Sequence, residues 1–149
     1  MNRFSAMALV LCMLISARSS FTQPVKLDRN DFVELQRTEC LGSCPVYTVR
    51  IFADGRVVWK GKSAVKVRGD ATSHVALAEA SKLIEKFIAS GFWDLPDPHG
   101  RSSVDGPSSI TTLHVGKRER RYPGISPIWV ELLGLKVDSL ANTKQWTGR

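Results

Sequence analysis

Two cysteines separated by three residues are the part of this sequence best suited to chemistry. Cys40 and Cys44 enclose Leu-Gly-Ser, and Gly42 can adopt the unusual backbone angles that so tight a loop requires. Pro45 then fixes φ where the next strand begins. We expect the cysteines to form a local disulfide. Because this bond would close only a few residues, it would stabilise the fold by about 2 kcal/mol at most and would mainly shape the loop.

The same cysteines admit two other kinds of chemistry. A thiol–disulfide redox role is the main alternative, although the C-x-x-x-C spacing differs from the C-x-x-C of thioredoxin and no βαβ pattern surrounds it. A tetrahedral zinc site would need two further ligands, and the three histidines are scattered singly along the chain: His74, His99 and His114. We therefore expect no metal and no cofactor at the cysteines.

Other residue types with catalytic potential are better explained structurally. Four candidate ligands for a divalent cation lie in one proline-containing loop: Asp94, Asp97, His99 and Asp105. Their spacing matches neither an EF-hand nor a metalloprotease helix, so we interpret the loop as a polar connection and keep a metal-dependent enzyme as the weakest alternative. The chain has no G-x-S-x-G motif, and Ser126 followed by proline is typical of a helix start. We expect no catalytic residues.

Basic side chains are concentrated in and beside two predicted hairpins. If the hairpins paired side by side, these side chains would form one cationic face for an anionic ligand; otherwise they are a solvated face and edge that discourages edge-to-edge pairing. The residues of this candidate face are Lys60, Lys62, Lys66, Lys117, Arg118, Arg120 and Arg121.

Alternating apolar and polar residues predict the strands that carry these groups. Asp54-Gly55 and Gly116-Lys117 mark the turns of two hairpins. The predicted strands are 32–37, 46–52, 56–61, 63–68, 109–115 and 118–122.

Apolar residues at three- and four-residue spacing predict a helix over 75–90, capped by Thr72 or Ser73, and a second from Ser126-Pro127 to about Thr143. The apolar face of the second helix is expected to contain Ile128, Leu132, Leu135 and Leu140. The order β-β-β-β-α-β-β-α predicts an α+β fold, mainly an antiparallel sheet of five to six strands with two helices packed on one face.

The motif around the cysteine loop resembles the signature of a known family. Cys40-x-Gly42-x-Cys44-Pro45-x-Tyr47, followed by Asp54-Gly55, is similar to the C-x-G-x-C-P-x-Y … D-G pattern of a bacterial secreted family of domains of unknown function. The resemblance continues through the 83–95 region to the Ala141-x-Thr143-x-x-Trp146 tail. No established activity comes with this family, so the resemblance implies kinship without a mechanism.

The first residues indicate export. A basic Arg3, an apolar run over 6–15 and Ala17-Arg18-Ser19 have the three-part layout of a secretory signal. We expect residues 1–19 to be a signal peptide, with an uncleaved anchor as the alternative, residues 20–30 a lead-in segment, and residues 31–146 a single domain. The full chain of 149 residues has a net charge of +7, which suits solubility and does not by itself indicate nucleic acid.

These observations favour a non-enzymatic binding or accessory module that is secreted or periplasmic. The cysteine loop would recognise the partner, with Gly42, Pro45 and Tyr47 as candidate binding residues. We expect the partner to be an envelope protein or an anionic polymer. Nucleic acid is not expected of an exported protein, and no stable membrane span is expected after signal cleavage.

Overall fold

The computed structural model describes residues 25–97, 109–124 and 126–148, and these form an antiparallel sheet with helices packed against it. The elements in chain order are β1 (Phe32–Arg37), β2 (Val46–Phe52), β3 (Arg56–Ser63), β4 (Gly69–His74), α1 (Leu77–Ala89), a short 3₁₀ helix η1 (Phe92–Asp94), β5 (Ser109–Val115), β6 (Arg118–Gly124), α2 (Ile128–Leu140) and α3 (Lys144–Thr147). The predicted fold class and element order are confirmed.

The six strands lie in the order β4-β3-β2-β1-β5-β6, and every neighbouring pair is antiparallel. The first strand of the chain therefore lies inside the sheet, where it pairs with both β2 and β5. The hairpin of β3 and β4 and the hairpin of β5 and β6 lie at opposite edges. The two predicted hairpins, β2–β3 and β5–β6, do not pair with each other, because β1 lies between β2 and β5.

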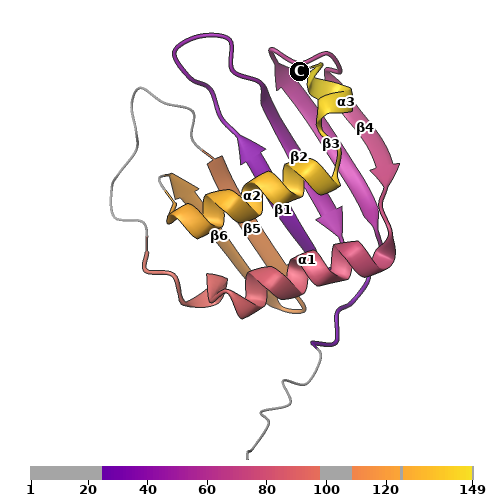
Figure 1. Ribbon diagram of the computed structural model, residues 1–149, viewed down its shortest axis with the longest axis vertical. Helices are drawn as coiled ribbons and strands as arrows, with labels where there is room; N and C mark the ends of the chain where they lie inside the picture. Colours follow the sequence, from indigo (N-terminus) through magenta and orange to yellow (C-terminus); the bar gives the residue numbers. More distant parts are fainter. Residues whose placement is uncertain (1–24, 98–108, 125, 149) are drawn as a thin grey trace, which may run out of the picture.

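Both long helices cross the same face of the sheet, and no helix of the described residues lies on the opposite face (Figure 1). α2 contacts β1, β2 and β5, and α1 contacts β2. The strand alternation places fully buried apolar side chains under these helices: Val33, Leu35, Val49, Ile51, Val57 and Trp59. From α1, the buried side chains are Ala80, Leu83, Ile84 and Phe87. This shared core is the hydrophobic contribution that holds the layers together.

The predicted fourth strand over 63–68 is wrong, because β4 begins only at Gly69. The segment 63–68 is a connection in which Val65 and Val67 pack against the core. The backbone N–H groups of Lys66 and Val67 donate to the carbonyls of Thr147 and Trp146, so this segment pairs with the C-terminal turn rather than with a strand. The alternation of apolar and polar residues in 63–68 therefore reflects packing of the valines against the core and not pairing in the sheet.

The predicted helix ends also need correction. α1 begins at Leu77 with Ala76 as its N-cap, since Thr72 and Ser73 still belong to β4. At α2, Pro127 occupies the N-cap and Ser126 makes no capping hydrogen bond. Neither helix has a side-chain cap, so packing on the sheet contributes most of their stability.

The apolar face predicted for α2 is not the face that packs on the sheet. Val130, Leu133 and Val137 are buried there, with Gly134 approaching Leu35. The predicted residues Ile128, Leu132 and Leu135 are exposed to 74%, 54% and 56%, and Leu140 is partly buried. α2 ends at Leu140 and not near Thr143, and the separate helix α3 follows.

The predicted signal peptide, residues 1–19, and most of the lead-in segment lie outside the described residues. Within the described ranges, no helix is both long enough and apolar enough to cross a membrane.

Candidate functional site

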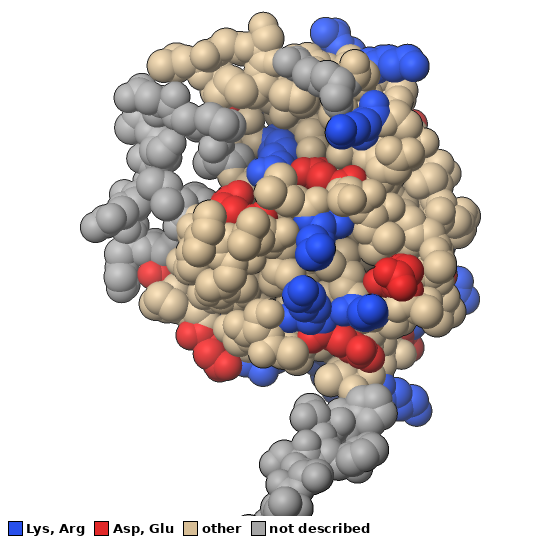
Figure 2. Space-filling model, in the orientation of Figure 1, with Lys and Arg blue, Asp and Glu red and all other residues tan. Residues whose placement is uncertain are grey.

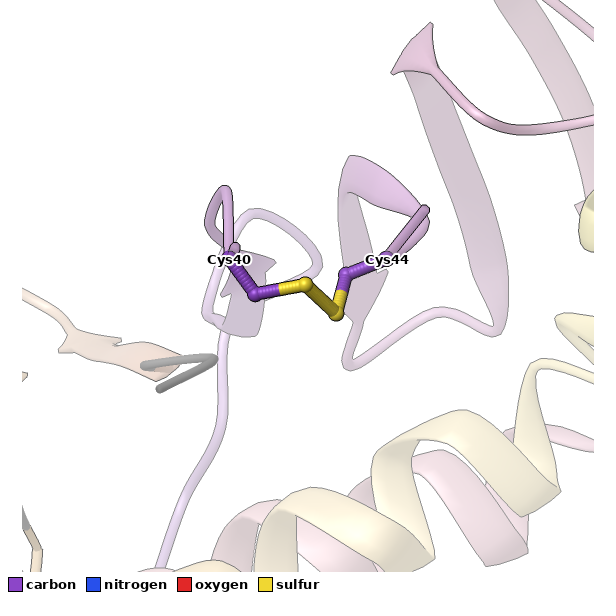
Figure 3. Close-up of a disulfide and its surroundings, with 2 residues drawn as sticks. All are labelled: Cys40 and Cys44. Atoms are coloured by element: carbon purple, nitrogen blue, oxygen red, sulfur yellow. A yellow bond between two sulfur atoms is a disulfide. The ribbon is translucent and has the colours of Figure 1, made fainter. Parts of the chain in front are cut away.

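The cysteine loop joins β1 to its antiparallel neighbour β2, and a disulfide closes it as predicted. Cys40 and Cys44 are bonded, with their Cα atoms 5.8 Å apart, and Figure 3 shows the bond spanning the two arms of the loop. Gly42 has a φ of +136°, which side-chain-bearing residues rarely adopt, so glycine suits this position. Leu41 is 80% exposed beside it. The bond thus holds a short loop that presents a large apolar side chain to solvent.

A partly buried polar cluster lies at the base of this loop. The guanidinium of Arg37, the last residue of β1, donates to Oδ2 of Asp138 over 2.8 Å. The hydroxyl of Tyr47, opposite Arg37 on β2, donates to Oδ1 of the same carboxylate over 2.6 Å. Thr143 also donates to Oδ1, over 3.3 Å. One α2 carboxylate therefore fixes both strands at the point where the loop begins and ends.

A second carboxylate of α2 extends the cluster along β1 and β5. Glu131 lies 3.7 Å from the Arg37 guanidinium and accepts a hydrogen bond of 2.7 Å from Ser109. Burial by itself would lower the pKa of Arg37, but the hydrogen bond and the charge of Asp138 outweigh it and raise that pKa. The arginine therefore stays charged and holds α2 against the sheet.

Aromatic stacking fixes the ring of Tyr47. Its ring lies 4.5 Å from that of Trp59, which in turn lies 5.1 Å from the ring of Trp146. The indole N–H of Trp59 donates to the carbonyl of Val67 over 3.0 Å. The rings of Tyr47 and Trp59 thus belong to the core, while the Tyr47 hydroxyl reaches the polar cluster.

The ionisation of Tyr47 makes this arrangement testable. Burial first, and then the Asp138 carboxylate, raise the pKa of Tyr47 well above its ordinary value. In the unfolded chain the Tyr47 hydroxyl loses its proton at about pH 10, whereas in the folded chain it keeps this proton. The stability that neutral Tyr47 contributes is therefore complete below about pH 10 and declines at higher pH. We expect urea unfolding between about pH 10 and 11 to show a steeper loss of stability for the wild type than for Tyr47→Phe; equal slopes would contradict the burial of this phenol.

A hollow of about 540 Å³ lies beside the cluster. Its lining includes Pro45 and Tyr47 from the sheet side and Leu135, Asp138 and Thr143 from the helix side. Two of the three candidate binding residues, Pro45 and Tyr47, therefore border one concave surface next to the disulfide, while Gly42 lies in the loop itself. The lining combines apolar side chains with a carboxylate and hydroxyl groups, which suits a ligand that has both apolar and polar groups.

The seven basic residues of the candidate anionic-ligand face are not gathered in one place. Lys60 lies on β3 and Arg121 on β6, both on the face without helices, four strand spacings or about 19 Å apart. Lys62 pairs with Glu39 over 2.8 Å. Lys66 lies in the β3–β4 connection and Lys117 in the β5–β6 turn.

Arg118 and Arg120 have a structural role on the helix-bearing side of β6. The guanidinium of Arg118 lies 4.4 Å from the centre of the Trp93 ring. Arg120 donates to the carbonyls of Trp93 and Leu95 and lies 3.4 Å from Asp97. Together they hold the η1 segment against the sheet edge.

The weakest alternative, a metal-dependent site in the loop after α1, is described only in part. Asp94 and Asp97 lie within the described residues, where Asp97 pairs with Arg120, whereas His99 and Asp105 lie outside them. In the described ranges, no three His, Cys, Asp or Glu side chains come together as a metal site.

The partners of Tyr47 are not among the residues predicted for the site. Arg37 has the same strand parity as the buried Val33 and Leu35, so a charged side chain on a core-facing position was a signal for a buried partner. Asp138 gave no comparable signal, because it adjoins the core residue Val137 in a helix whose apolar residues face several directions.

A comparison with known protein families finds a match to this chain. Residues 31–123 match the model of a domain of unknown function, DUF6438. The matched segment contains the cysteine loop, all of β1 to β5, α1 and most of β6, while α2 with Asp138 follows it. No curated protein matches the chain. Because the match spans more than half of the 149 residues, the chain belongs to the DUF6438 family of domains of unknown function.

Proposed function

We propose that this protein is a non-enzymatic binding or accessory module that acts outside the cytoplasm and recognises a protein partner through its disulfide-closed loop. The observation that carries the proposal is Leu41, 80% exposed on a loop that the Cys40–Cys44 bond constrains. Burial of apolar surface drives most protein association, and a loop already held in shape loses less conformational entropy when it binds.

The surroundings of the loop support the same role. Arg37, Asp138 and Tyr47 anchor the ends of both strands, so the loop emerges from a rigid base. The hollow that Pro45 and Tyr47 border, where the loop enters β2, could accept a partner side chain.

The proposed location outside the cytoplasm rests on the signal-like first residues and on the disulfide, which persists in oxidising compartments. We also propose that the C-x-G-x-C-P-x-Y pattern is the feature that the chain shares with bacterial relatives. An anionic polymer is a weaker candidate partner than a protein, since the basic residues expected to form one face are dispersed.

The thiol–disulfide redox alternative has less support from the geometry. Cys40 and Cys44 lie in a loop between two strands, whereas a helix N-terminus is what lowers the pKa of the attacking thiol in many exchange proteins. Glu39, directly before Cys40, would disfavour a thiolate rather than stabilise it. A reduction potential within about −120 to −270 mV, measured in glutathione buffers, would favour the redox role over the binding role.

The binding proposal predicts that loop variants lose partner capture while keeping their fold. Cys40→Ser/Cys44→Ser should reduce the free energy of unfolding by about 2 kcal/mol at most, because the closed segment is short. Leu41→Ser should leave stability unchanged. Both should lose the proteins that the wild type retains from an envelope extract, measured by quantitative mass spectrometry.

The matched control is Leu77→Ser, which removes another exposed leucine, 62% accessible, from the start of α1. This variant should retain the captured proteins. The proposal fails if Leu41→Ser and the double cysteine variant capture the same proteins, in the same amounts, as the wild type.

A further inference from the structure

α2 is apolar on its outer side as well as its inner side. We call Ile128, Leu132 and Leu135 the α2 ridge; they are exposed to 74%, 54% and 56%. The inner side already buries Val130, Leu133 and Val137 against the sheet, so the ridge is additional to what the fold needs. Contiguous exposed apolar residues on one helix face are typical of an interaction surface.

A groove runs along this ridge between α2 and α1. One hollow of about 470 Å³ is lined by Trp129, Leu132 and Leu133 of α2 and by Lys86 of α1. A second, of about 510 Å³, continues towards Leu83 and Leu140. The two share Lys86, Lys136 and Ser139, and so form one continuous groove. The surface is therefore concave as well as apolar.

The charged side chains that line the groove are mainly basic. Lys82, Lys86 and Lys136 line it, and Glu79 is the acidic residue among its lining. All three lysines are exposed, and none of them forms an ion pair with any other residue of the described ranges. Figure 2 shows basic side chains in the middle of this face, where α1 and α2 run past each other, with acidic side chains beside them. Carboxylates placed over the groove would meet complementary charge.

We propose that the groove between α1 and α2 binds an acidic, amphipathic segment of a partner protein, with apolar residues against the α2 ridge and carboxylates against Lys82, Lys86 and Lys136. A helix laid into an apolar groove is a common mode of peptide recognition. A second copy of this chain would bring the same lysines against one another, and a flat bilayer would leave the hollows unfilled. The inference rests on the proposed binding role but concerns a different surface, which shares Leu135 and Ser139 with the lining of the hollow beside the cysteine loop. Variants that avoid these two residues let the two proposals fail separately.

The test is a selection of random peptides, displayed on phage, for binding to the full protein purified from the cells that express it. Enriched peptides should combine apolar residues at three- and four-residue spacing with an excess of Asp and Glu. A synthetic copy of the best peptide should bind less tightly as salt increases, measured by fluorescence anisotropy.

Two double variants locate the binding. Ile128→Ser/Leu132→Ser and Lys86→Glu/Lys136→Glu should each raise the Kd of that peptide at least about tenfold. All four side chains are exposed, so these replacements should leave the fold intact. Leu41→Ser should leave this Kd unchanged and lose only the partners of the cysteine loop.

Three results would overturn the inference. The first is the absence of enriched peptides, or enrichment without an acidic excess. The second is an unchanged Kd in both double variants. The third is ridge-dependent binding to vesicles that contain phosphatidylglycerol, or ridge-dependent dimerisation in sedimentation, in place of peptide binding.

Discussion

Replacing Asp138 with alanine is expected to lower the free energy of unfolding by about 3 kcal/mol, measured by urea denaturation at neutral pH. The carboxylate accepts hydrogen bonds from Arg37, Tyr47 and Thr143, and its side chain is only 18% exposed. Its removal leaves the Tyr47 phenol without its acceptor and leaves the Arg37 guanidinium only the longer, 3.7 Å ion pair with Glu131; unpaired polar groups that water reaches poorly are costly. Because this one side chain holds the ends of β1 and β2 to α2, the base of the cysteine loop should loosen with it.

Two variants separate this effect from a general loss of charge. Asp138→Asn keeps an acceptor oxygen but removes the negative charge, so it should fall between wild type and Asp138→Ala. Glu39→Ala removes a carboxylate that pairs with Lys62 over a similar 2.8 Å, but these two side chains are 70% and 71% exposed. This second variant should be indistinguishable from the wild type, since exposed ion pairs contribute little. An equal loss for Asp138→Ala and Glu39→Ala would show that the partly buried cluster has no special weight.

Local features of the chain were predictable because their causes are local. The alternation in 32–37 and 46–52 reflects burial on one side of a sheet, and both strands have the predicted bounds. The disulfide followed from spacing, since Cys40 and Cys44 can meet only by closing their own loop. In both cases a few consecutive residues determine the outcome.

The errors arose where different structures produce the same local pattern. Val65 and Val67 alternate with Lys66 and Arg68, yet the N–H groups of Lys66 and Val67 donate to carbonyls of α3 and not to a neighbouring strand. In α2, apolar residues occur both at the ridge and at the inner face, so their spacing could not identify the side that packs on the sheet. The helical period of α2 was therefore correct, but the presence of two apolar sides on this helix, which indicates a second contact surface, was not recognised.

The site depended on contacts that no local pattern contains. Asp138 meets Arg37 across 101 positions and Tyr47 across 91. The basic residues failed to meet for a similar reason, because β1 pairs with both β2 and β5 and so separates the two predicted hairpins. Tyr47 could be selected from its place beside the loop, but its partners required the tertiary structure.

The close approach of two chain segments at Gly61 is a further feature that the sequence did not reveal. Gly61 lies on the buried side of β3, and a Cβ added there would overlap the carbonyl oxygen of Val67. It would also lie 2.9 Å from the indole nitrogen of Trp59, which donates to that same carbonyl over 3.0 Å. The missing side chain therefore lets the 63–68 connection fold over the strand.

Gly61→Ala is accordingly expected to lower the free energy of unfolding by about 3 kcal/mol, because overpacking displaces the Val67 backbone and weakens the Trp59 hydrogen bond. Gly116→Ala is the matched control: its Cβ would meet no atom within 4 Å, so its φ of +62° is the only source of strain, about 1 kcal/mol. Urea denaturation of both variants should show the larger loss for Gly61→Ala, together with faster amide exchange at Val67. If Gly61→Ala proves no less stable than Gly116→Ala, the connection does not pack on β3 as closely as the structure indicates.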